Sequence, residues 1–193
     1  GVYKKSKFFA EEFVRNIVFN ENIPVVIVNP STPIGPRDIK PTPTGRLILE
    51  AARGKVPAFV NTGLNVVHVD DVADGHLLAF ERGVIGEKYI LGGENIELID
   101  ILAEVAKITG RQPPKIKLPH NLILPFGYVA EAWTWMVGGN SPFVTVDGIR
   151  MSKKKMFFSS KKAMLKLGYK PRLTRAAITD AISWFDQMGR LRI

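Results

Sequence analysis

Hydrophobic residues in the first half of the chain follow two alternating spacings. Over residues 3–20 they recur every three or four positions, which predicts an amphipathic helix. Residues 25–28 are a continuous β-branched run, typical of a strand that is covered on both faces. The same alternation continues and predicts helices over 44–52 and from an Asp71 cap onward, and strands over 56–60, 65–69 and 88–91. Helices and strands that alternate along the chain indicate an α/β fold with a parallel sheet.

The second half is more helical. A regular apolar pattern predicts a helix that starts at Asn95–Glu97 and stops at Gly110. Residues 118–139 are strongly apolar but are interrupted by polar residues and proline, which favours a buried or pocket-covering helix over a bilayer span. An aromatic face that lies on a membrane or admits a lipid-like substrate is the alternative. A strand at 156–158, a helix over 160–167 and a terminal helix capped by Thr174 complete the prediction.

Residues 29–43 carry five prolines and Gly35, and we expect a loop without regular structure. This segment leaves the carboxyl end of the predicted strand 25–28, and ligands of open α/β sheets bind at that end. Prolines there would form a pre-ordered wall against a ligand. A proline-rich surface connection explains the same residues equally well.

Composition and charge exclude several classes of site. The 193 residues contain no cysteine and three histidines, so thiolate chemistry is excluded and a metal site is not expected. Of the net charge of +9, residues from Arg150 onward carry 12 Lys/Arg against 2 Asp, and the remaining 15 Lys/Arg and 16 Asp/Glu nearly cancel. This basic region has no nucleic-acid motif, and we interpret it as a solvated surface, with no nucleic-acid partner. The chain begins directly in a charged helix, from which we expect a cytoplasmic protein.

The candidate chemistry begins with Tyr3 and Lys7. Residues four apart lie on one face of a helix, so the phenol and the ammonium would point the same way. A nearby ammonium favours the phenolate and lowers the pKa of the phenol, which suits Tyr3 to acid/base chemistry near neutral pH. The same spacing is also common by chance on helices.

Two further patterns could mark a metal or acid/base site and a nucleotide-binding loop. His68, Asp70 and Asp71 stand together at a strand–helix junction, where a helix cap and a buried hydrogen bond are more usual than a metal or acid/base site. Gly92 and Gly93 follow a strand, but no Gly-x-Gly-x-x-Gly nucleotide fingerprint occurs in the chain.

Taken in order, these motifs resemble the extended short-chain dehydrogenases/reductases. The likeness rests on Tyr-x-x-x-Lys at 3–7, Asn-Pro to Gly-Pro-Arg over 29–37, and His-Val-Asp-Asp-Val-Ala over 68–73. It continues in Phe-Phe-Ser-Ser-Lys at 157–161 and Leu-Gly-Tyr-Lys-Pro at 167–171. The sequence of residues 29–46 and 62–65 most resembles that of the hopanoid-associated sugar epimerases, which are related to dihydroflavonol 4-reductases.

The resemblance implies the C-terminal part of a Rossmann-type domain over residues 1–93 and a small mixed α/β substrate domain mostly over 94–193. It implies NAD or NADP as the cofactor, a small-molecule substrate that is sugar-like or dihydroflavonol-like, and a homodimer through the helix 3–20. Tyr3 would be the general acid/base and would contact the cofactor. Lys7 would bind the cofactor ribose. Pro30, Ser31, Thr32 and Pro33 would line the nicotinamide end of the cofactor.

The sequence departs from this family in two places. The glycine-rich loop and the catalytic Ser/Thr that precede the tyrosine in these enzymes are absent, so we expect a fragment that is inactive alone. Leu64-Asn65 stands where many nucleotide-sugar epimerases carry an arginine, which argues against a nucleotide-diphosphate sugar. The alternative function is a non-catalytic binding or assembly module that uses an open sheet edge or the basic C-terminal surface.

Overall fold

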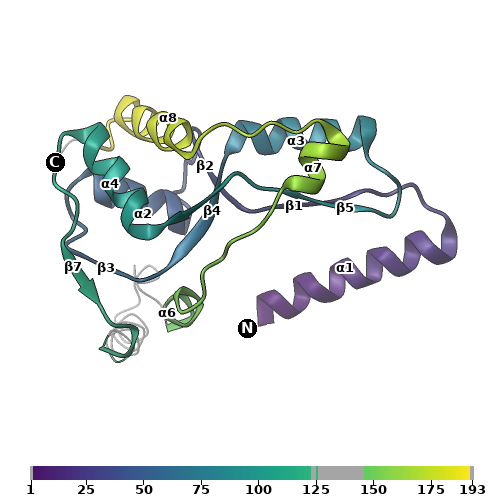
Figure 1. Cartoon of the computed structure of the whole chain (residues 1–193), viewed down its shortest axis with the longest axis horizontal. Coiled ribbons are helices and arrows are strands. Elements are labelled where there is room, and N and C mark those ends of the chain that lie inside the picture. Colours follow the sequence, from purple (N-terminus) through teal and green to yellow (C-terminus); the bar gives the residue numbers. More distant parts are fainter. Residues whose placement is uncertain (1, 123–124, 126–145, 192–193) are drawn as a thin grey trace.

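The computed structural model describes residues 2–122, 125 and 146–191, and for residues 2–4, 146 and 147 the backbone alone. Its first helix, α1 (Val2–Glu21), lies below the body of the molecule in the view of Figure 1. The strands are β1 (Ile27–Pro30), β2 (Thr32–Ile34), β3 (Ala58–Val60), β4 (Gly63–His68), β5 (Lys88–Leu91), β6 (Glu94–Glu97) and β7 (Ile116–Leu118). The other helices are α2 (Pro43–Ala52), α3 (Val69–Arg82), α4 (Leu98–Thr109), α6 (Val146–Ser152), α7 (Lys161–Leu167) and α8 (Thr174–Gln187).

The strands form three small sheets. β1 pairs with β5, and β3 pairs with β7, in parallel. The third sheet has the order β2-β4-β6, with β2 parallel and β6 antiparallel to the central β4. Parallel strands connected by helices confirm the predicted α/β fold class.

The hydrophobic core lies on both faces of β4. Val66 belongs to a cluster that joins α2, α4 and α8, and the neighbouring Val67 belongs to a second cluster that joins α3, α7 and β5. Both side chains are almost fully buried, as the alternating directions of strand residues require when each face is covered. β4 is therefore the strand covered on both faces, whereas the predicted strand 25–28 is only half-buried and starts at Ile27.

Several predicted boundaries were wrong. The expected loop over 29–43 contains the end of β1, all of β2 and the first residue of α2. Pro33 is compatible with β2 because β2 is an edge strand, where a missing N–H leaves no ladder bond unmade. Residues 94–97 form β6 instead of starting a helix, because they pair with residues 63–66 of β4. Met156 makes only an isolated bridge to Leu64, so the predicted strand 156–158 is absent.

Helix ends were predicted better than caps. α4 ends at Gly110, which has the left-handed backbone (φ 68°) expected for a glycine at this position. His68, not Asp71, caps α3, and its Nδ1 accepts a hydrogen bond from the Asp70 N–H. Thr174 is the first residue of α8, preceded by Leu173 as the cap.

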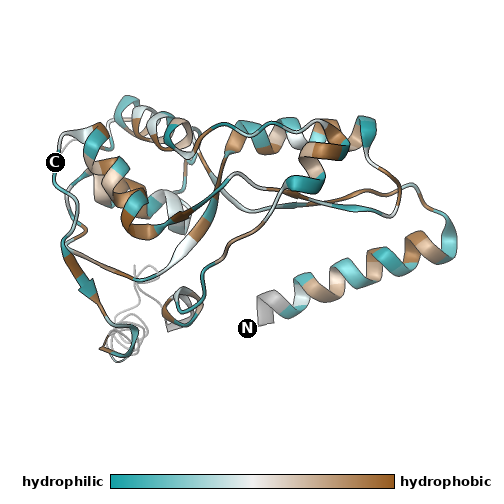
Figure 2. Ribbon diagram, in the orientation of Figure 1, coloured by the Kyte–Doolittle hydropathy of each residue, from teal (hydrophilic) through white to brown (hydrophobic). Residues whose placement is uncertain are grey.

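The apolar face of α1 is largely exposed. Figure 2 shows hydrophobic residues recurring along the helix, and Phe8, Phe9, Phe13 and Phe19 are 60–86% exposed. Across the described ranges, no helix is both long and apolar enough to cross a membrane. Most of the apolar segment 118–139, with its predicted helix, lies outside the described residues.

Candidate functional site

Helix α1 is joined near its middle to strand β1. The helix and the strand run in opposite directions, as Figure 1 shows, and Glu11 joins them. Glu11 Oε1 lies 2.8 Å from Lys88 Nζ on β5, and Glu11 Oε2 accepts a long hydrogen bond (3.4 Å) from Asn29 Nδ2 on β1. The hydrogen bond from Lys88 is the largest effect that holds the pKa of Glu11 below its ordinary value.

The predicted catalytic residues lie on the same helix before this contact. Lys7 is one turn before Glu11 and Tyr3 is two turns before it. Lys7 is exposed. The Tyr3 side chain lies outside the described residues, so its direction relative to Lys7 stays a prediction.

The predicted cofactor wall follows β1 directly. Pro30 is the last residue of β1 opposite Leu91, and the Ser31 N–H donates to the Leu91 carbonyl at 3.1 Å. Thr32 and Pro33 continue into β2, so an ordered backbone holds the whole segment. Among the described residues the buried Ser31 hydroxyl has no hydrogen-bond partner. A buried polar atom without a partner is unusual, and a bound amide or hydroxyl of a ligand would satisfy it.

Asn65 has a structural role that the sequence analysis did not find. Its side chain is fully buried, its Nδ2 contacts the carbonyl of Gly93 and the Oδ1 of Asn95, and its Oδ1 accepts from the Gly93 N–H. A Cβ on Gly93 would lie 2.2 Å from the carbonyl oxygen of Val66, so this packing requires a glycine. The amide at this position is thus committed within the fold and does not replace the arginine of nucleotide-sugar epimerases.

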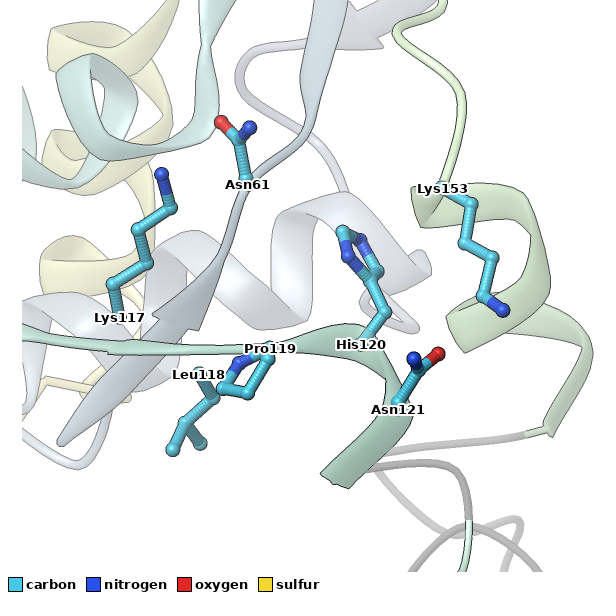
Figure 3. Close-up of a pocket in the computed structure, with 7 residues that line it drawn as sticks. All are labelled: Asn61, Lys117, Leu118, Pro119, His120, Asn121 and Lys153. Carbon is cyan, nitrogen blue, oxygen red and sulfur yellow. The ribbon is translucent and has the colours of Figure 1, made fainter.

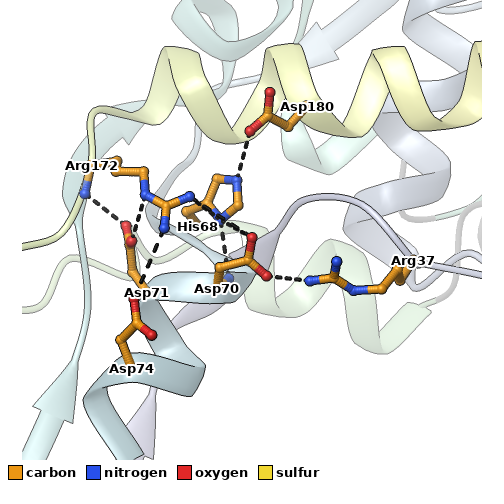
Figure 4. A network of polar contacts seen from close by, with 7 residues as sticks. All are labelled: Arg37, His68, Asp70, Asp71, Asp74, Arg172 and Asp180. Carbon is orange, nitrogen blue, oxygen red and sulfur yellow. Dashed lines mark hydrogen bonds and ion pairs between the residues drawn. The ribbon is translucent and has the colours of Figure 1, made fainter. Parts of the chain in front are cut away.

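The polar group around His68 is structural, as predicted. His68 is buried, and because its Nδ1 accepts from the Asp70 N–H, its Nε2 carries the proton and donates to Asp180 Oδ2 at 3.1 Å. Figure 4 shows His68 between α3 and α8. The contact therefore joins the carboxyl end of β4 to the terminal helix.

A second part of this network holds the segment before α8. The buried Asp71 carboxylate accepts from the backbone N–H of Arg172 at 2.7 Å and from its Nε at 2.9 Å (Figure 4). Burial raises the pKa of the nearby Tyr169 phenol, and the charges of Asp71 and Asp74 add to this effect. Tyr169 therefore stays neutral and is no candidate acid/base. Within the described part of the chain, no group of acidic or histidine side chains is arranged to hold a metal ion.

Comparison with known proteins supports the resemblance. Residues 1–92 match the family model described as the NAD dependent epimerase/dehydratase family. The chain is 46% identical over its whole length to a putative dihydroflavonol 4-reductase of Synechocystis sp., and 32% identical over 86% of its length to sterol demethylase protein B of Methylococcus capsulatus. It spans 57% and 51% of these relatives, about half of their length.

Solved structures agree with the fold. The crystal structure of gox2253 is 56% identical, with a TM-score of 0.82 over the whole chain and 58% of that protein. PA4631, a nucleoside-diphosphate-sugar epimerase from Pseudomonas aeruginosa, is 28% identical, with a TM-score of 0.74 over the whole chain and 57% of that protein. A UDP-glucuronic acid 4-epimerase from Bacillus cereus in complex with NAD is 21% identical (TM-score 0.70, 97% of this chain and 53% of that one), which shows the common fold alone.

Proposed function

We propose that this chain, whose residues 1–92 match the NAD dependent epimerase/dehydratase family, forms part of an NAD- or NADP-dependent oxidoreductase or epimerase. Its reaction centre is the start of α1 together with residues 30–33. The observation that supports this proposal is the Glu11 contact with β1 and β5, which joins the helix of Tyr3 and Lys7 to the strand that ends at Pro30. Ligands of open α/β sheets bind at that end.

In this proposal Tyr3 moves the proton. Its phenolate takes the proton of a substrate hydroxyl during oxidation, and its phenol returns a proton to the carbonyl oxygen during reduction. Lys7 lowers the pKa of the phenol and donates hydrogen bonds to the cofactor ribose. The bound nicotinamide supplies the hydride chemistry at the same carbon. An epimerase returns the hydride to the opposite face of that carbon, and a reductase releases the product.

Residues 30–33 hold the nicotinamide end of the cofactor in this scheme. The Ser31 hydroxyl, which has no partner among the described residues, supplies a hydrogen-bonding group, and the proline rings of Pro30 and Pro33 supply rigid apolar surface. These residue types suit a carboxamide attached to an aromatic ring.

The 193 residues alone are expected to bind the cofactor weakly and to be inactive. A helix N-terminus after a glycine-rich turn is the usual site for a dinucleotide pyrophosphate, and the sequence holds no such fingerprint. Fluorescence titration of this chain with NADH and NADPH tests this expectation. Tight, saturable binding would contradict it.

The substrate is proposed to be sugar-like or dihydroflavonol-like. The names of the reductase relative from Synechocystis and of the epimerase PA4631 support these two classes. Leu64 and Asn65 favour a substrate without a nucleotide diphosphate at that position, since Leu64 packs against the core and the Asn65 amide is committed to Gly93 and Asn95. In this proposal residues 1–93 bind the cofactor, and most of the substrate-binding residues lie in 94–193.

We further propose a homodimer through the helix 3–20 and residence in the cytoplasm. The four exposed phenylalanines of α1 favour the dimer, because a row of aromatic side chains on one helix is unusual for a free surface. The same face, together with the edge of β1 that has no described strand partner, favours the second candidate function, a non-catalytic assembly module.

Tyr3→Phe distinguishes an enzyme from a module. In the complete enzyme, loss of the acid/base should reduce kcat by about 10²–10⁴-fold. Self-association, measured by analytical ultracentrifugation, should remain. Unchanged turnover in Tyr3→Phe would contradict the enzymatic proposal.

A further inference from the structure

A pocket of about 560 Å³ lies beside the end of β3, and none of its described lining residues belongs to α1. It is formed by three segments that are far apart in the sequence: the residue after β3, the end of β7 with the turn that follows, and the residue after α6 (Figure 3). Its lining residues are Asn61, Lys117, Leu118, Pro119, His120, Asn121 and Lys153.

Among the described residues, the lining of the pocket carries positive charge without a neutralising carboxylate. None of its lining residues is acidic, and neither Lys117 nor Lys153 forms an ion pair with a carboxylate of the described ranges. Lys155, two residues after Lys153, forms an ion pair with Glu97. This nearby carboxylate therefore pairs with a lysine that does not line the pocket. Two lysines with no acidic neighbour among the described lining residues favour an anion at this hollow.

The two lysines are held on opposite sides of the pocket. The His120 Nε2 donates to the Ser152 carbonyl at 3.0 Å, which fastens the turn after β7 to the end of α6. Figure 3 shows Lys117 on one side of His120 and Lys153 on the other. Asn61 and Asn121 add amide N–H donors, which suit the oxygens of phosphate and carboxylate groups.

We infer that this pocket binds an anionic oxygen group, a phosphate or a carboxylate, carried by the substrate. The inference rests on the proposed function, because it assigns the pocket to the substrate of that reaction. Leu64 and Asn65 supply no cation at the position that holds the diphosphate in nucleotide-sugar epimerases, whereas Lys117 and Lys153 supply two at a different place. In the projection of Figure 1, α6 lies between the strands of this pocket and the start of α1.

Binding is tested on this chain without cofactor or turnover, so the result is independent of the Tyr3 proposal. Inorganic pyrophosphate and citrate serve as the probes in isothermal titration calorimetry. Lys117→Gln/Lys153→Gln should weaken saturable binding of at least one probe about tenfold. The control Lys154→Gln/Lys170→Gln removes the same charge from exposed positions outside the pocket and should change binding less than about twofold. Circular dichroism checks that both variants fold.

The absence of saturable binding to either probe overturns the site. An equal loss in both double variants also overturns it, because binding would then belong to the basic surface as a whole. In the complete enzyme, the pocket variant should raise KM for an anionic substrate and leave kcat unchanged. Unchanged KM with intact probe binding assigns the pocket to free anions and overturns the substrate assignment.

Discussion

Glu11 Oε1 lies 2.8 Å from Lys88 Nζ, and this ion pair joins residues 77 positions apart in the chain. With the weaker contact to Asn29 it fastens the middle of α1 to the sheet. The position of Lys7, one turn before Glu11, therefore depends on this contact. A small change at Glu11 is expected to matter more for the proposed reaction than for folding.

Glu11→Gln should lower stability by about 0.5 kcal/mol at pH 7, because it removes one partly exposed ion pair. The fold lowers the pKa of Glu11, so its stabilising effect is present above the ordinary pKa of 4.5 and is lost as pH falls through the folded value. The difference between the wild type and Glu11→Gln in urea denaturation should thus shrink from pH 7 to about pH 3. A difference that grows toward low pH would contradict this assignment.

Asp180→Ala should destabilise the chain by about 1–3 kcal/mol, since it leaves the buried Nε2–H of His68 without an acceptor. Asp180→Asn keeps an acceptor oxygen at the same place and is the matched control, with a smaller loss. Chemical denaturation measures both variants. Equal stability of Asp180→Ala and Asp180→Asn would show that the His68 contact contributes nothing.

Asn65→Ala should cost about 1–3 kcal/mol, because the buried Gly93 N–H loses its acceptor. Asn20→Ala, at an exposed position of α1, should stay within about 0.5 kcal/mol of the wild type. Thermal denaturation compares the two. If Asn65→Ala were as mild as Asn20→Ala, water would have to replace the amide.

Tyr169→Phe should raise stability by about 1 kcal/mol, since the Tyr169 hydroxyl is buried and has no partner among the described residues. The variant should keep full turnover in the complete enzyme, because this phenol is no acid/base. A loss of activity with intact stability would instead assign Tyr169 a role in the reaction.

The sequence predicted local structure well where the residues of one segment determine its secondary structure. The helix 3–20, the strand 88–91 and the stop at Gly110 all follow from spacing or from one glycine. β6 and β2 were missed because their strands exist only through pairing with β4, which no local pattern of residues 94–97 or 32–34 reveals.

The candidate site divides in the same way. The Tyr3–Lys7 spacing and the proline-rich segment are visible in the sequence because their residues are neighbours. The contact of Glu11 with Lys88 and the pocket of Lys117 and Lys153 join distant segments, so only the fold reveals them. The polar His68 group was correctly predicted to be structural, but its partner Asp180 lies 112 positions away.

In the proposed reaction, Lys7 makes the phenol of Tyr3 acidic enough to act near neutral pH. The most direct test is the pH dependence of turnover for the complete enzyme and for Lys7→Met, with Lys5→Met as the control that removes an exposed lysine at another position of α1. Substrate oxidation requires the phenolate, so the midpoint of its rise with pH should move to higher pH in Lys7→Met and stay unchanged in Lys5→Met. Identical midpoints in all three proteins would contradict the proposal that Lys7 lowers the pKa of Tyr3.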